Sequence, residues 1–305
     1  MTGNIAIFVT DQRQKNLAGY LPGTKVLLDW HNVQDQTRAE DFVKNSRYLI
    51  FPTPVSRLNR HPKIEDMLKH ELITETNNDK NVIGGAFTDK WTQYLQMHEI
   101  TYFDLMKEEK VAQKNAYITA EATVAEILKY SDYSICGQKI IVCGYGRCGK
   151  CVADLLAAIG AKVTVLARSA KARRAARGDV HSLMSITSRR AARGDGHEAV
   201  DFSYGPEEVY GAHTIVNTVP AQVIREPMIQ EMHRDTVIID IASRPGGVDL
   251  VAAERREIKV VAALGLPGLY TTKSSAKVFA DAIIDQMQLQ QCKGGGKSWI
   301  YQIVI

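Results

Sequence analysis

A six-residue glycine segment, Gly144-Tyr145-Gly146-Arg147-Cys148-Gly149, constrains the fold of this chain more than any other feature. An apolar strand pattern at 139–143 precedes it, apolar residues at helical spacing between 151 and 159 follow it, and a second strand pattern lies at 162–167. In this order the three glycines permit a tight turn, close approach of the backbone to a pyrophosphate, and close packing of helix on strand. The start of the helix adds unpaired N–H groups and the positive end of a dipole. The segment therefore predicts a dinucleotide-binding α/β domain.

The residues that end the second strand indicate which dinucleotide is bound. An NAD site usually carries an acidic residue there, which accepts hydrogen bonds from the ribose 2′-hydroxyl. This chain has Arg168 and Ser169 instead, a cation and a hydroxyl that suit a 2′-phosphate. We expect NADP as the cofactor, with NAD left open. Two later strands are predicted at 214–220 and 236–241, and the residues at their ends complete the expected cofactor site with Thr218, Val219, Pro220, Ile241 and Ala242.

Composition narrows the class of protein. A chain of 305 residues has room for two domains, and its 45% hydrophobic and 24% charged content is typical of a globular protein. The net charge is only +4 and its excess gathers between residues 168 and 193, so we expect no nucleic-acid partner. No run approaches the roughly 20 apolar residues of a membrane span. We therefore expect no contact with a membrane. Five cysteines fit a reducing cytoplasm, and because they lack zinc-site spacing we expect no bound metal.

The rest of the chain divides around the dinucleotide domain. Five short apolar segments alternate with helical stretches before residue 115 and predict a parallel, flavodoxin-like sheet, at 5–9, 25–28, 48–51, 81–85 and 100–103. We predict a smaller α/β domain at 1–114, a helix at 115–130 that opens a Rossmann domain at 115–275, a helix at 276–290 that returns to the first domain, and a tail at 291–305. In such an arrangement the substrate is expected between the lobes. A short repeat, 173–179 and 189–195, reads as a local surface duplication.

Two cations stand in loops where a carboxylate substrate is expected. Arg244 follows the apolar segment 236–241, and Lys273 lies after the last strand pattern, at 259–263. For each, an exposed surface charge is the competing interpretation. The histidine–carboxylate pair of a 2-hydroxy-acid dehydrogenase is not expected here, because all eight histidines lie at or before His233.

The chain resembles the dipicolinate synthase family, in particular its dinucleotide-binding A chains, over roughly residues 1–290. The resemblance depends on five segments, which are 52–57, 115–121, the glycine segment, 240–249 and 265–268. The most specific are Asn-x-x-x-Thr-Ala-Glu at 115–121 and Ser-Arg-Pro-Gly-Gly at 243–247. One difference is that Thr10-Asp11-Gln12-Arg13 stands where the family has a glycine-rich turn after the first strand.

The resemblance implies a function and a site. It implies NAD(P)-linked oxidation of a dihydro- or hydroxytetrahydro-dipicolinate to the aromatic diacid in sporulating bacteria, and its partner would be the flavoprotein-like B subunit of dipicolinate synthase. The two substrate carboxylates would suit Arg57, Arg244 and Lys273. Asn115, Thr119 and Glu121 match the family's interdomain segment, with Glu121 as a proton acceptor. We also expect a homo-oligomer.

Three alternatives remain open. One is a divergent dehydrogenase that acts on another imino or amino diacid. Another is a hydrolase or lyase with tightly held NAD, as in adenosylhomocysteine hydrolase, but that family is longer and has catalytic Asp and His residues that this chain lacks. The third is a non-catalytic dinucleotide-binding subunit that regulates its partner.

Overall fold

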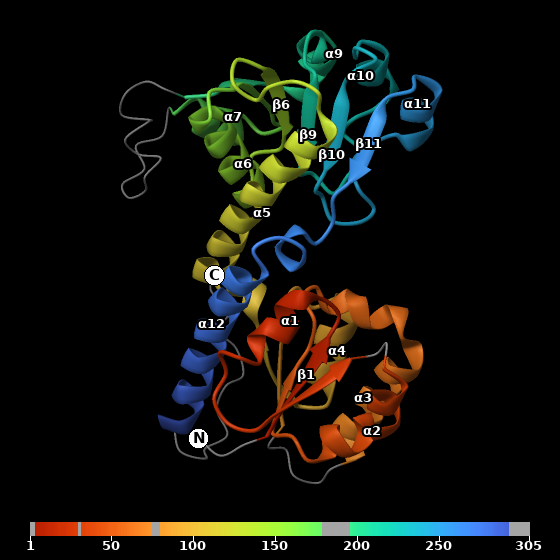
Figure 1. Ribbon diagram of the computed structural model, residues 1–305, viewed down its shortest axis with the longest axis vertical. Helices are drawn as coiled ribbons and strands as arrows, with labels where there is room; N and C mark the ends of the chain where they lie inside the picture. Colours follow the sequence, from red (N-terminus) through yellow and green to blue (C-terminus); the bar gives the residue numbers. More distant parts are fainter. Residues whose placement is uncertain (1–3, 30–31, 75–79, 179–195, 293–305) are drawn as a thin grey trace. The chain divides into compact units, whose positions relative to one another are not determined.

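The computed structural model describes residues 4–29, 32–74, 80–178 and 196–292 (Figure 1). The second copy of the repeat, 189–195, lies outside the described residues, as do residues 293–305 of the tail predicted at 291–305, whereas residues 291 and 292 are still helical. Contacts along the chain separate two compact units, residues 1–115 with 271–305 and residues 116–270. None of the helices in the described ranges is long and apolar enough to cross a membrane.

Unit 1 is built on a parallel five-stranded sheet in the order β2-β1-β3-β4-β5, the flavodoxin-like order. The strands are β1 Ile5–Val9, β2 Lys25–Asp29, β3 Tyr48–Ile50, β4 Asn81–Gly84 and β5 Thr101–Asp104. The helices between them are α1 Gln12–Leu17, α2 Val33–Lys44, α3 Pro62–Thr74 and α4 Asp89–Met97, and α12 Thr272–Cys292 joins them from the end of the chain.

Alternate residues of β1 serve two cores because side chains of a strand point to opposite faces. Ala6 and Phe8 pack in a cluster with Phe51 and Trp91, and all four are at most 2% exposed. Ile5 and Ile7 pack on the other side with residues of α12, among them Phe279. With both faces covered, the sheet takes the parallel arrangement that the continuous apolar segments predict.

Unit 2 contains a parallel six-stranded sheet in the order β11-β10-β9-β6-β7-β8. The strands are β6 Lys139–Cys143, β7 Lys162–Leu166, β8 Glu198–Val200, β9 Thr214–Asn217, β10 Val237–Asp240 and β11 Lys259–Ala262. The helices are α6 Arg147–Ala158, α7 Ala170–Arg177, α9 Gly205–Val209, α10 Glu226–Gln230 and α11 Leu250–Arg255. Counted from β6, this is the Rossmann order 3-2-1-4-5-6, so the predicted fold class is confirmed.

Two helices and one strand differ most from the sequence prediction. The helix expected at 115–130 is α5, Glu109–Tyr130, and begins six residues earlier with an acidic residue in its first turn, which suits the helix dipole. The helix expected at 276–290 begins at Thr272. The short strand β8 was missed, because Glu198, Ala199 and Val200 are too few to form an apolar pattern.

Candidate functional site

The glycine loop of unit 2 has the geometry that its motif predicts. Gly144 has a φ of +95°, which glycine adopts without strain, and its N–H donates to the carbonyl of Leu166 over 2.8 Å. A Cβ on Gly149 would lie 2.3 Å from the carbonyl oxygen of Gly144, so only glycine lets the helix approach the turn this closely. Both glycines are therefore needed by the fold itself.

Gly146 is needed for a different reason. A Cβ placed on it would meet nothing within 4 Å, and its φ of −77° suits any residue. It is exposed and is the N-cap of α6, whose first turn receives no side-chain cap. Bare backbone next to uncapped N–H groups fits a pyrophosphate, and this observation distinguishes a ligand site from a glycine turn that binds nothing. Arg147 is exposed there, while Tyr145 and Cys148 are half-buried.

The loops after β9 and β10 are held together by two buried polar residues. The Asn217 amide donates to Asp240 Oδ1 over 2.8 Å and to the Val219 carbonyl over 3.1 Å. Asp240 in turn accepts from the backbone N–H groups of Ala242 and Gly247. Asn217 is fully buried and Asp240 is 7% exposed. Neither residue was predicted to belong to the site, although both end apolar strands.

The predicted cofactor residues of these loops lie on this framework. The Thr218 hydroxyl donates to the Cys143 carbonyl over 2.8 Å, while Val219 is half-buried and Pro220 is exposed. Ile241 is half-buried and Ala242 is 3% exposed. All five follow the carboxyl ends of β9 and β10, at the same edge of the sheet as the glycine loop after β6.

The arginines after β7 have different roles. Arg173 forms an ion pair with Asp201 and donates to the carbonyls of Ala167 and Arg168, each over 2.7 Å, so its guanidinium is engaged within the protein. Arg168 itself is exposed. Ser169 caps α7 by accepting from the N–H of Ala172 over 3.1 Å, and its hydroxyl proton can still be donated. Arg168 is the exposed cation that lies nearest in the chain to the carboxyl end of β7.

A pocket of about 420 Å³ adjoins Arg168. Its walls are largely apolar, from Phe202, Val223 and Met228, and Arg225 lines it as a second cation. The Arg225 Nε–H donates to the Gln222 carbonyl over 3.1 Å, which orients the guanidinium. This volume and mixed lining are typical of a small-molecule site. Arg225 lies 57 positions beyond Arg168 and was not among the predicted site residues.

A larger hollow of about 1020 Å³ lies elsewhere on unit 2, lined by Lys139, Lys162 and His213 among others. These residues stand at or just before the beginnings of β6, β7 and β9. Ligands of open α/β sheets bind at the carboxyl ends of the strands, where the glycine loop and the smaller pocket lie and this hollow does not.

The predicted catalytic residues of unit 2 are Thr119, Glu121 and Arg244. Thr119 is 8% exposed and Glu121 is exposed, and two residues along a helix are about 200° apart, so they face nearly opposite sides of α5. Arg244 is exposed in the loop after β10.

In unit 1, Asn115 lies on α5 and Lys273 is exposed in the first turn of α12. Arg57 follows β3 and forms an ion pair with Asp11. The roles of these residues stay predictions.

Comparison with known proteins agrees with the fold. Residues 112–295 match the family described as alanine dehydrogenase/PNT, C-terminal domain. The dipicolinate synthase A chain of Bacillus subtilis (strain 168) is 31% identical over 179 residues, 59% of this chain. Because the match covers 55% of that protein, the chain spans about half the length of this relative.

Solved structures extend the similarity. The crystal structure of the dipicolinate synthase A chain from Bacillus halodurans superposes with a TM-score of 0.74 at 25% identity, over 93% of this chain and 97% of that one. A transhydrogenase from Sinorhizobium meliloti has a TM-score of 0.61 over 94% of each chain at 12% identity, which shows the fold alone. The chain therefore belongs to the alanine dehydrogenase/PNT C-terminal domain family, a family of NAD(P)-dependent dehydrogenases, and is similar to the A chain of dipicolinate synthase.

Proposed function

We propose that the chain is an oxidoreductase that uses NADP to convert a dihydro- or hydroxytetrahydro-dipicolinate to dipicolinate. The observation that carries this proposal is the bare Gly146 backbone at the uncapped start of α6, which fits a dinucleotide pyrophosphate. The similarity to the A chain of dipicolinate synthase supports the substrate class.

When bound, the cofactor accepts one hydride. A dihydro substrate then releases one proton to become the aromatic diacid, and a hydroxytetrahydro substrate must also lose one water. Aromatisation makes the reaction favourable, so the residues of the chain need mainly to bind and orient the diacid and to accept a proton. We propose Arg57, Arg244 and Lys273 for the carboxylates and Glu121 as the proton acceptor, with Asn115 and Thr119 as further contacts.

The preference for NADP rests on the pocket beside Arg168. Arg168 and Arg225 both line it, and the described part of the chain pairs neither guanidinium with an acid. A 2′-phosphate would receive charge-assisted hydrogen bonds from these cations. Because Arg173 is paired with Asp201, we propose that Arg168 and Arg225 decide the preference for NADP over NAD.

The test is to incubate the purified chain with hydroxytetrahydrodipicolinate and either NADP or NAD, with and without a flavoprotein-like B subunit. The readouts are dipicolinate and reduced nicotinamide, and we expect both to form in equal amounts and faster with NADP. Tight dinucleotide binding without product under every combination would overturn the proposed reaction. It would favour a dehydrogenase of another imino or amino diacid, or a non-catalytic regulatory subunit.

A further inference from the structure

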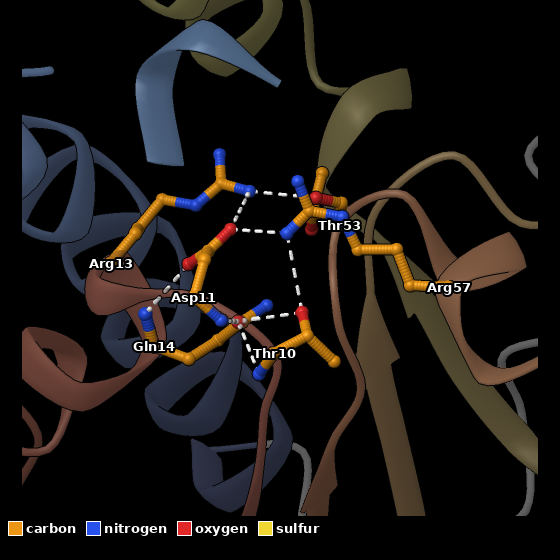
Figure 2. A network of polar contacts seen from close by, with 6 residues as sticks. All are labelled: Thr10, Asp11, Arg13, Gln14, Thr53 and Arg57. Carbon is orange, nitrogen blue, oxygen red and sulfur yellow. Dashed lines mark hydrogen bonds and ion pairs between the residues drawn. The ribbon is translucent and has the colours of Figure 1, made fainter. Parts of the chain in front are cut away.

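The turn after β1 and the turn after β3 lie at a position where open α/β sheets bind ligands. The chain runs from β1 to β2 on one side of β1 and then crosses to β3 on its other side. The strand order therefore reverses between β1 and β3, which is the topological switch point of the sheet. Ligands bind outside the carboxyl ends of the strands at such a point. Polar side chains gather here, namely Thr10, Asp11, Arg13, Gln14, Thr53 and Arg57 (Figure 2).

The turn after β1 is closed without glycine. Asp11 caps α1 by accepting from the N–H of Gln14, and the Gln14 side chain accepts from the backbone N–H groups of Thr10 and Asp11 over 3.1 Å each. This reciprocal capping box fixes the Asp11 carboxylate at the start of the turn. The Thr10–Arg13 segment, which departs from the family's glycine-rich turn, is therefore held by hydrogen bonds of its own polar side chains and of Gln14.

Two guanidinium groups share the Asp11 carboxylate. Figure 2 shows Arg13 and Arg57 facing each other across it, with the Arg57 Nη1 donating to Asp11 Oδ2 and the Arg13 Nη2 3.5 Å from the same oxygen. Arg57 also donates to the Thr10 hydroxyl over 3.2 Å. In the part of the chain that the structure describes, Asp11 is the one acid paired with either arginine. The cluster therefore carries one positive charge in excess.

That excess charge is held largely away from water. The side chain of Arg13 is 4% exposed and that of Asp11 is 8% exposed. Burial lowers the pKa of Arg13 to about 10; Asp11 opposes this shift and Arg57 adds to it, so Arg13 is still charged at neutral pH. A buried cation without full compensation is costly to the protein, and a bound anion would remove part of that cost.

Arg13 also keeps a donor unused. Its Nε–H is buried and has no hydrogen-bond partner. Arg57 is 20% exposed on its side chain, so the same cluster is reachable from solvent. A buried N–H that forms no hydrogen bond is costly to the folded protein, and a ligand oxygen is one way to satisfy it.

A purely structural role for Arg13 accounts for only part of these contacts. Its Nη2 donates to the Thr53 carbonyl over 2.7 Å and its guanidinium lies 4.6 Å from the centre of the Phe279 ring. These contacts join the two turns to α12. They do not explain the unused Nε–H, or a second arginine drawn to the same carboxylate.

We infer that Arg13 and Arg57, held by Asp11, form a binding site in unit 1 for a carboxylate of a small planar diacid. Arg13 supplies the buried, fixed cation and Arg57 the accessible one. The inference rests on the proposed function for the identity of the ligand and adds to it Arg13, a residue that was not among the predicted site residues. An arginine fork suits a carboxylate because its N–H groups match both oxygens.

The test measures binding of dipicolinate to the full-length protein by isothermal titration calorimetry, with and without saturating NADP. We expect Arg57→Gln to weaken dipicolinate binding by about ten-fold or more, and Arg57→Lys by less, since the charge remains. Arg47→Gln is the matched control, an exposed arginine of the same unit that precedes β3 instead of following it, and should leave binding unchanged. Dipicolinate binding that is absent in the wild type, or equal in Arg57→Gln and Arg47→Gln, would overturn the inference.

Arg13→Lys is informative only if the variant folds, so a second measurement uses the unmodified protein. With ¹⁵N in the arginine side chains, dipicolinate should shift the Nε–H resonances of Arg13 and Arg57 but not that of Arg47. Unshifted Arg13 and Arg57 resonances at saturation would contradict the inference. Dinucleotide binding separates the two proposals. If Arg57→Gln binds NADP and turns over substrate with unchanged KM, the carboxylate site is wrong and the proposed reaction stands. If dipicolinate binding depends on Arg57 but the wild-type protein turns over no substrate, the carboxylate site stands and the proposed reaction is wrong.

Discussion

The side-chain amide of Asn217 donates to Oδ1 of Asp240 over 2.8 Å and so joins the loops that follow two adjacent strands of unit 2. Val219 N–H donates back to Asn217 Oδ1 over 3.1 Å, which satisfies the other end of the amide. The buried side chains of Asn217 and Asp240 therefore hold the Ser-Arg-Pro-Gly-Gly segment in position.

Replacing Asn217 by Ala should lower the free energy of unfolding by about 1–3 kcal/mol, because the amide's hydrogen bonds are lost and Asp240 loses its buried donor. Urea denaturation followed by circular dichroism measures the loss. Asn4→Ala, which removes an exposed side-chain hydrogen bond, is the comparison and should cost less than about 0.5 kcal/mol. Equal losses in the two variants would show that the buried pair adds nothing.

Replacing Gly146 by Ala should leave the melting temperature unchanged, since a Cβ there meets nothing within 4 Å. It should weaken dinucleotide binding by about ten-fold or more, or about 1.4 kcal/mol, because the methyl group occupies the space of the pyrophosphate. Gly149→Ala should lower both stability and binding, since its Cβ would lie 2.3 Å from a backbone oxygen. Unaltered binding in Gly146→Ala would mean that the loop is only a turn.

The two arginines of the smaller pocket should set the choice of cofactor. Arg168→Ala and Arg225→Ala should each weaken NADP binding by about ten-fold or more, the loss of a charge-assisted hydrogen bond, and change NAD binding by less than about three-fold. Fluorescence titration of both cofactors gives the ratio. Arg255→Ala, an exposed arginine on α11, is the matched control. An equal loss of NADP and NAD binding would show that the arginines attract any negatively charged dinucleotide instead of recognising the 2′-phosphate.

Cys148 should report on occupancy of the glycine loop. Burial raises the pKa of its thiol, against a smaller opposing effect of Arg147. The reactive thiolate is therefore scarce at neutral pH, and alkylation should speed up as pH rises past the ordinary range of a cysteine. Saturating dinucleotide should slow labelling of Cys148 but not of the exposed Cys136, as mass spectrometry of digested protein would show. Identical rates at Cys148 with and without cofactor would place the dinucleotide elsewhere.

Patterns local in the chain predicted most of the fold. The apolar runs predicted ten of the eleven strands in the described ranges, because a buried parallel strand must be apolar on both faces. The glycine segment predicted the turn into α6, since Gly144 is required by the backbone conformation and Gly149 by the packing of helix on turn. Strand β8 was missed because its three residues form too short a pattern.

The candidate site was less predictable because its contacts join residues far apart in the chain. Sequence could not show that Arg173 is engaged by Asp201, 28 residues away, and Arg168 is not. It gave no sign that Arg225 reaches the same pocket. Arg13 was seen only as part of a turn without glycine, since its pairing with Arg57 across Asp11 depends on β1 and β3 being neighbours.

The return of α12 to the sheet of unit 1 has a consequence for synthesis on the ribosome. Unit 2 is a continuous segment, residues 116–270, whereas the core around Ile5 and Ile7 needs Phe279 and Ile283 from more than 270 positions later. Emergence from the ribosome is slow compared with the folding of a small domain. The dinucleotide domain can thus fold before α12 has been synthesised, while the core around Ile5 and Ile7 is still incomplete. A nascent chain released before α12 is made would expose the apolar side of the unit 1 sheet that α12 covers, where chaperones can bind.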